Sequence, residues 1–184
     1  MNDYIFQIYN KTSLKILSYI AMHNKEDLLA KEVQDKFRLS KGSINQHLKF
    51  LLNFDLIKRI KRANLFLYSA NNESIILRQF KIFETLLILK DLIKELGPYS
   101  YRIILFGSCA TGTNVEDSDI DLFIHTESVE KTQKICNKYS YKIISLRPII
   151  QDTLALTITK KQDKAFYEQV KQGIILLEGE PLHE

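Results

Sequence analysis

The chain has 184 residues, of which 45% are hydrophobic and 26% are charged, and its formal net charge is +4. This length predicts one large domain or two small ones, and the composition excludes disordered, collagen-like and low-complexity classes. We expect a cytoplasmic protein without a membrane span, because the N-terminus lacks a signal-peptide pattern, no apolar run reaches 18 residues, and the two cysteines have no disulfide or zinc spacing.

The positive charge is concentrated at the N-terminal end. Residues 1–70 carry 12 Lys and Arg against 6 Asp and Glu, which gives +6. Residues 71–98 are neutral with 4 of each, and residues 99–184 carry 10 against 12, which gives −2. This asymmetry predicts two parts with different partners, a polyanion for the first and a metal ion for the last.

Apolar spacing in the first part predicts three helices and a hairpin. Helices are expected over 12–23 and 26–37, and a third from Lys41 with Ser40 as its N-cap. The period then changes, which predicts a β-hairpin over 56–70.

A long helix over 73–96 is expected next, closed by Gly97 and Pro98. Its apolar residues form two stripes that lie well over 90° apart. One stripe contains Ile82, Leu86, Leu89, Ile93 and Leu96, and the other contains Ile76, Phe80, Phe83 and Leu87. Because both must be covered, we expect a homodimer in which one stripe packs on a second subunit.

The remainder reads as mixed α/β. Strands are expected over 101–106, 119–125, 141–150 and 174–177, and helices over 128–139 and 159–172. Pro148 places the third strand at an edge or a strand end. The sequence therefore predicts an α+β chain: a winged-helix domain over 1–72, a connecting and dimerising helix over 73–98, and a small mixed-sheet α/β domain over 99–184.

Three helices followed by a basic hairpin favour a winged helix that binds DNA. The expected base-reading and phosphate-binding residues on the third helix are Lys41, Ser43, Asn45, Gln46 and Lys49. The expected phosphate-binding residues on the hairpin are Lys58, Arg59, Lys61 and Arg62. The alternative is a winged helix that contacts protein. His47 is expected to pack beside the hairpin.

The stretch LSKGSINQHLKFLLNFDLI resembles the recognition helix of winged-helix transcriptional regulators of the arsenical-repressor type. The resemblance covers roughly residues 10–70. It departs at Asp55, where such families usually carry Gly at the end of the helix, and this change affects the turn more than the DNA contact.

A second motif lies after the strand at 101–106. Gly107 and Ser108 open a short helix suited to phosphate, and ten residues later Asp119 and Asp121 point to one face of a strand. Paired carboxylates of this kind suit Mg²⁺ that also takes phosphate oxygens from a substrate.

This pattern resembles the signature of the polymerase-β nucleotidyltransferase superfamily, in its minimal branch. Gly112 and Ser118 also fit the pattern as nucleotide-binding residues, with Gly107 and Ser108. The resemblance implies transfer of a nucleoside monophosphate from an NTP to an acceptor with two Mg²⁺, and it implies that Asp119 and Asp121 are the catalytic, metal-binding pair.

The third carboxylate that the family usually supplies from a neighbouring strand has no match in 141–150. Ser145 and Arg147 stand near its expected place. The remaining candidate acids lie off that strand: Asp152, Glu127 and Glu116. Cys109 and His125, which lie close to the motif, are expected to be structural.

Two functions are compatible with these motifs. The first is a Mg²⁺-dependent nucleotidyltransferase located on DNA, whose acceptor is a partner protein in some minimal members. The second is a DNA-binding regulator whose second domain only binds nucleotide. A weaker third option is the antitoxin of a toxin–antitoxin pair, with both properties.

Overall fold

The computed structural model describes residues 10–23, 27–139 and 146–180. The chain divides into two compact units, residues 1–79 and 80–184. Across the described residues, no helix combines the length and the apolar character needed to cross a membrane.

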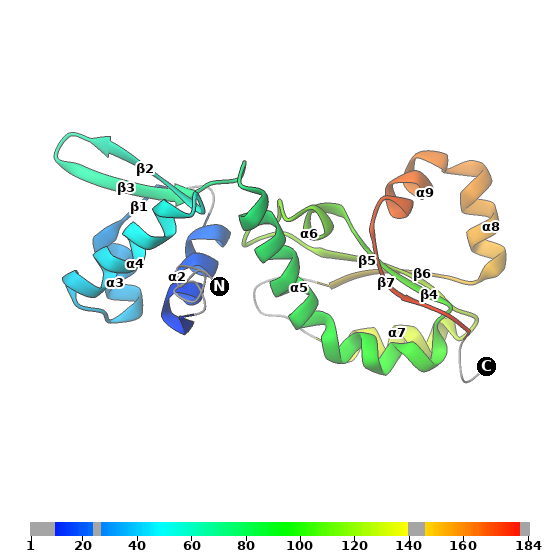
Figure 1. Ribbon diagram of the computed structural model, residues 1–184. Coiled ribbons are helices and arrows are strands. Elements are labelled where there is room, and N and C mark those ends of the chain that lie inside the picture. Colours follow the sequence, from blue (N-terminus) through cyan, green and yellow to red (C-terminus); the bar gives the residue numbers. More distant parts are fainter. Residues whose placement is uncertain (1–9, 24–26, 140–145, 181–184) are drawn as a thin grey trace, which may run out of the picture. The chain divides into compact units, whose positions relative to one another are not determined.

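In its described residues, the first unit contains three helices and a three-stranded antiparallel sheet in the order β1-β3-β2 (Figure 1). Its elements are α2 (Lys11–Met22), β1 (Leu28–Leu29), α3 (Ala30–Phe37), α4 (Lys41–Asn53), β2 (Ile57–Arg62) and β3 (Leu65–Ala70). The core lies between the helices and the base of the hairpin, where Ile20, Val33, Leu48 and Tyr68 are buried.

Local sequence explains how these elements begin and end. Ser40 caps α4, since its side chain accepts a hydrogen bond from the backbone N–H of Ser43 at 3.2 Å. Asp55, after this helix, has φ 53°, the left-handed conformation that favours glycine. The helix predicted over 26–37 is wrong at its start, because residues 28 and 29 form β1 against β3 and the helix begins at Ala30.

The second unit is built on a four-stranded mixed sheet in the order β6-β5-β4-β7. Its strands are β4 (Arg102–Phe106), β5 (Ile120–His125), β6 (Leu146–Gln151) and β7 (Ile174–Glu178). Its helices are α5 (Ile75–Leu96), η1 (Gly97–Tyr99), α6 (Gly107–Thr111), α7 (Val129–Lys138), α8 (Thr153–Gln162) and α9 (Lys164–Lys171). The first turn of α5 belongs to the first unit. Strands β5 and β6 are parallel, whereas β4 is antiparallel to both of its neighbours.

Helices cover both faces of this sheet (Figure 1). On one face α8 and α9 pack over a buried cluster that contains Ile104, Phe106, Phe123 and Val170. The alternate residues of β4 and β5, such as Leu105 and Leu122, are fully buried on the other face, where α5 and α7 lie. Sheets with β–α connections are typically covered in this way.

Two predicted elements differ from the structure. The helix expected over 159–172 is two helices. Helix α8 begins earlier, at Thr153, and helical structure is interrupted at Asp163. The Asp163 side chain caps α9 by accepting a hydrogen bond from Phe166 N at 3.0 Å. Of the strand expected over 141–150, residues 141–145 lie outside the described residues. The described part, β6, is an edge strand, as Pro148 predicted.

Helix α5 has one buried and one exposed apolar side. Its buried residues are Leu77, Lys81, Ile82, Thr85, Leu89, Leu92 and Leu96. In the second predicted stripe, Ile76, Phe83 and Leu87 are 55–57% exposed, and Phe80 is half-buried. The predicted first stripe therefore overlaps the buried side, but the buried side also includes a lysine and a threonine.

Candidate functional site

The glycine-serine turn and the aspartate pair meet at one end of β4 and β5. Phe106, the last residue of β4, is paired with Asp121 of β5, so Gly107 follows directly beside Asp121. Gly107 has φ 70°, and a Cβ on this residue would lie 2.5 Å from Asp121 Oδ2. Glycine is favoured here, because any other residue would strain the backbone and its Cβ would force the Asp121 carboxylate to move.

The loop between α6 and β5 is held by its own hydrogen bonds. Gly112 ends α6 with φ 69°, and Thr113 N donates to the carbonyl of Ser108 at 3.0 Å. Ser118 Oγ accepts from Val115 N at 2.8 Å, and Ser118 N donates to Val115 O at 2.9 Å. Gly112 and Ser118 therefore shape the loop that carries the chain from the turn to the aspartate pair.

A buried lysine fixes the same loop from outside. Lys81 on α5 is only 1% exposed, and its Nζ donates to the carbonyl of Asn114 at 2.7 Å. Burial lowers the pKa of its ammonium group, and the nearby Glu84 and Cys109 oppose this shift. Sequence analysis missed Lys81, because a lone lysine in an amphipathic helix normally lies on the solvent side.

Arg147 stands opposite the aspartate pair. It is the register partner of Asp121 in the parallel pairing of β5 with β6. Its Nη1 lies 3.4 Å from Asp119 Oδ2, and its Nε lies 3.9 Å from Asp121 Oδ1. Burial raises the pKa of Asp121; Arg147 opposes this rise and the charge of Asp119 adds to it. Asp119 directly precedes β5, so the strand begins one residue later than predicted.

The aspartate pair fits one divalent ion. Mg²⁺ is commonly held by one or two carboxylates together with water and substrate phosphates. Among the described residues, no His, Cys, Asp or Glu joins Asp119 and Asp121 in a group of three.

The other candidate acids have different roles or places. Asp152 caps α8, because its Oδ1 accepts from Ala155 N at 2.7 Å. Glu127 accepts hydrogen bonds from the backbone N–H and the hydroxyl of Thr153. Glu116 is exposed in the loop before β5. Ser145 lies outside the described residues.

Cys109 and His125 have the structural surroundings that the sequence predicted. Cys109 is fully buried in α6, its thiol donates to the carbonyl of Asp119 at 3.4 Å, and burial raises its pKa to about 11. A thiol with this pKa is protonated and unreactive at neutral pH. His125 Nε2 lies 3.0 Å from Thr153 Oγ1 at the far end of β5.

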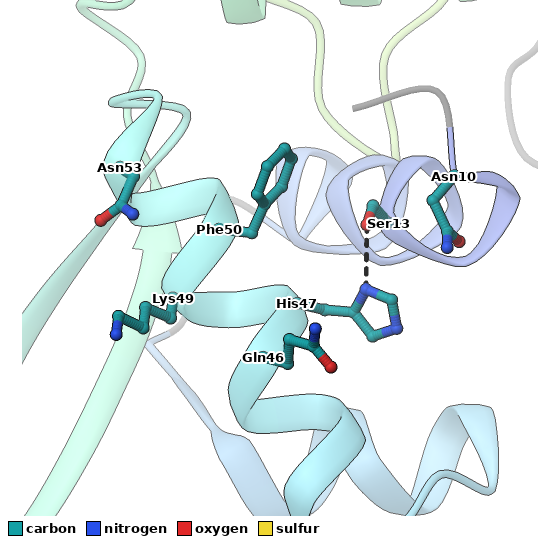
Figure 2. Close-up of a pocket in the computed structure, with 7 residues that line it drawn as sticks. All are labelled: Asn10, Ser13, Gln46, His47, Lys49, Phe50 and Asn53. Atoms are coloured by element: carbon teal, nitrogen blue, oxygen red, sulfur yellow. Dashed lines mark hydrogen bonds between the residues drawn. The ribbon is translucent and has the colours of Figure 1, made fainter. Parts of the chain in front are cut away.

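In the first unit, the predicted DNA-contacting residues of α4 lie mainly on one exposed side. Lys41, Asn45, Gln46 and Lys49 are exposed, whereas Ser43 is half-buried near the start of the helix. Farther along, this side forms one wall of a shallow groove of about 470 Å³ with the start of α2 (Figure 2). The groove is lined by Asn10, Ser13, Gln46, His47, Lys49, Phe50 and Asn53.

His47 faces α2 in this groove rather than the hairpin, so its predicted position is wrong. Its Nδ1 lies 2.9 Å from Ser13 Oγ, as Figure 2 shows. Burial lowers the pKa of His47, so the imidazole is neutral at pH 7. The residue joins the two helices.

The four predicted cations of the hairpin all lie on β2 and are exposed. Lys58 Nζ donates to Glu73 at 2.7 Å, and Arg62 is 4.0 Å from Asp27. Arg59 lies over the ring of Phe66, 4.5 Å from its centroid. Lys61 lies between Ile60 and Arg62, at a position whose register partner is Phe66.

Comparisons with known proteins place the second unit in a family. Two solved structures are similar to the chain. One is reduced HlyU from Vibrio cholerae N16961, with 23% identity over 45% of this chain and 82% of that chain and a TM-score of 0.36. The other is described as a nucleotidyltransferase from Sulfolobus solfataricus, with 16% identity over 55% of this chain and 86% of that chain and a TM-score of 0.37. No curated protein matches the sequence. The sequence model of the nucleotidyltransferase domain family matches residues 86–177, which is half of the chain. The protein therefore belongs to this family.

Proposed function

We propose that the protein binds a nucleoside triphosphate in its nucleotidyltransferase unit and transfers the nucleoside monophosphate to an acceptor, while its first unit binds DNA. The observation that carries this proposal is the position of Gly107 against Asp121. It places a turn suited to phosphate and a carboxylate suited to a metal ion beside each other.

Residues of this turn have separate tasks in the proposal. Gly107 lets the triphosphate approach the backbone, and the Ser108 hydroxyl donates to a phosphate oxygen. Gly112 and Ser118 keep the loop in shape, as their backbone conformation and hydrogen bonds support. Asp119 and Asp121 would hold Mg²⁺, which when bound would neutralise phosphate charge and act as a Lewis acid at phosphorus.

A second candidate function is nucleotide binding without transfer, in a DNA-binding regulator or antitoxin. Arg147 favours it, because a cation faces the aspartate pair from the edge strand and the described part of that strand contains no acid. A transferase needs a group that takes the proton of the attacking hydroxyl. In this second function the nucleotide serves as a signal that modulates DNA binding. In the first, the acceptor is a hydroxyl, for example on a partner protein.

For the first unit we propose a winged helix that binds duplex DNA through residues 1–70. Helix α4, which follows α3 after a short turn, would enter the major groove with Lys41, Asn45, Gln46 and Lys49 toward the DNA. The exposed side of α4 and the basic β2 strand support this proposal. Phosphate would compete with Glu73 for Lys58 and with Asp27 for Arg62.

The experiment that separates the two candidates is incubation of the protein with labelled NTPs, Mg²⁺ and candidate acceptor proteins. Transfer of label that is lost in Asp119→Asn with Asp121→Asn identifies a transferase. Equilibrium binding of NTP without transfer identifies a regulator. The matched control is Glu116→Gln with Asp117→Asn, which removes two acidic groups from the same loop. Absence of both transfer and NTP binding in the wild type would contradict both candidates.

A further inference from the structure

A single arginine touches both members of the aspartate pair. The parallel register between β5 and β6 places Arg147 beside Asp121, and the guanidinium reaches Asp119 with one nitrogen and Asp121 with another. The two carboxylates therefore share a positive charge supplied by the protein itself.

The ion pair is short enough for Arg147 to weaken metal binding by the aspartates, and exposed enough for Arg147 to leave them. At distances of 3.4 and 3.9 Å, the guanidinium pairs with the same two carboxylates that would hold a divalent ion. The Arg147 side chain is 67% exposed, so it is well solvated. A solvated ion pair on a long flexible side chain contributes little to stability and is easily exchanged for another partner.

We propose that Arg147 competes with a divalent metal ion for Asp119 and Asp121, so that the free ion binds weakly and enters the site together with an NTP. Guanidinium groups bind phosphate oxygens through paired, charge-assisted hydrogen bonds. An arriving triphosphate therefore draws Arg147 away from the carboxylates while it brings its own metal ion. The second half of this inference, entry with NTP, rests on the proposed nucleotide binding; the competition itself does not.

The test is a titration with Mn²⁺ in the absence of nucleotide, followed by electron paramagnetic resonance of the free ion. The variants are Arg147→Gln, which removes the charge, and Arg147→Lys, which keeps it. The expected gain in Mn²⁺ affinity for Arg147→Gln is roughly tenfold, the size expected for charges of +1 and +2 about 5 Å apart in water. Arg147→Lys should stay close to the wild type.

Two controls locate the effect. Arg102→Gln removes a comparable ion pair, with Glu178, at the other end of the adjacent strand β4, and it should leave Mn²⁺ affinity unchanged. Adding Asp119→Asn and Asp121→Asn to Arg147→Gln should abolish the gain. The inference is overturned if Arg147→Gln binds Mn²⁺ like the wild type, if Arg102→Gln or Arg147→Lys gains as much, or if the gain survives without the aspartates.

A second titration, with ATP present, tests the coupled entry. The difference in Mn²⁺ affinity between the wild type and Arg147→Gln should shrink at least severalfold, and an unchanged difference would overturn the release of Arg147 by phosphate. If the wild type binds no ATP, the proposed nucleotide binding fails, and with it the entry of the ion together with NTP. The nucleotide-free comparison still decides whether Arg147 competes with the metal.

Discussion

Gly107 lies so close to Asp121 that a Cβ on Gly107 would be 2.5 Å from Asp121 Oδ2. We therefore expect Gly107→Ala to displace the carboxylate and to strain a backbone with φ 70°. The strain alone costs about 1–2 kcal/mol in the free energy of unfolding, and the affinity for NTP should fall at least tenfold. Chemical denaturation and calorimetric titration measure the two effects.

The matched control for this variant is Gly42→Ala in α4, where a Cβ would meet nothing within 4 Å. Alanine is about 0.5–1 kcal/mol more favourable than glycine inside a helix, so this variant should keep or raise the stability and leave NTP binding unchanged. NTP affinity of Gly107→Ala equal to that of the wild type would contradict the placement of phosphate at this turn.

Much of the fold follows from patterns that a single element carries by itself. Ser40 indicates the start of α4, and the change from helical to alternating spacing indicates the hairpin. Pro148 indicates an edge strand because it has no N–H to offer a neighbour. By contrast, β1 is two residues long and is defined only by its pairing with β3, which no local pattern reveals.

The residues of the site also fall into those that a local pattern reveals and those that depend on contacts between elements. Gly107, Asp119 and Asp121 stand at a spacing that a linear motif can express. Arg147 and Lys81 act across the fold: one through strand register, the other through burial against the carbonyl of Asn114. The sequence locates Arg147 near the expected third carboxylate but does not indicate that it contacts both aspartates. For Lys81 it offers no sign, because a lysine on a predicted helix is normally assigned to solvent.

Lys81 leads to a prediction about pH. Its pKa in the folded protein is lowered below the ordinary value of 10.5, so the unfolded chain holds the proton more tightly and burial of the charge costs stability at neutral pH. Lys81→Met removes this cost together with the hydrogen bond to Asn114, so its free energy of unfolding relative to the wild type should be highest near pH 7, and this relative advantage should shrink as the pH approaches 10.5. Urea denaturation of both proteins across this range measures the difference.

The same variant should weaken NTP binding, because the loop that contains Asn114 loses its anchor. Lys90→Met, at an exposed position of the same helix, provides the control, and it should change neither the pH dependence nor NTP affinity. An advantage of Lys81→Met that stays constant up to pH 10 would contradict a buried ammonium with a lowered pKa.

The exposed side of α5 predicts a homodimer. Ile76, Phe80, Phe83 and Leu87 are spaced by four, three and four residues, the spacing of a helix–helix seam. Light scattering at tens of micromolar should give twice the chain mass of 21.5 kDa. Phe83→Glu with Leu87→Glu should give the monomer, because charges do not tolerate burial without partners.

Helix α8 offers a control for the dimer, since Leu154 and Ile158 are also exposed, at 70% and 45%. Leu154→Glu with Ile158→Glu should leave the mass unchanged if the seam lies on α5. A monomeric wild type would refute the predicted dimer, and loss of the dimer in the α8 variant instead would move the interface to that helix.

DNA binding should depend steeply on salt and reside in the first unit. Each phosphate that a cation neutralises adds about −0.9 to the slope of log affinity against log salt. Arg59→Ala with Arg62→Ala should weaken binding to all duplexes and flatten this slope.

Asn45→Ala with Gln46→Ala should instead relax sequence preference, because each side chain that pairs well with a base edge contributes about 1–3 kcal/mol of discrimination. Lys160→Ala with Lys164→Ala removes two positive charges from the second unit and should change neither property. Selection on random duplexes measures the preference, and if the full-length protein retains no duplex even at low salt, α4 and the hairpin bind a protein instead.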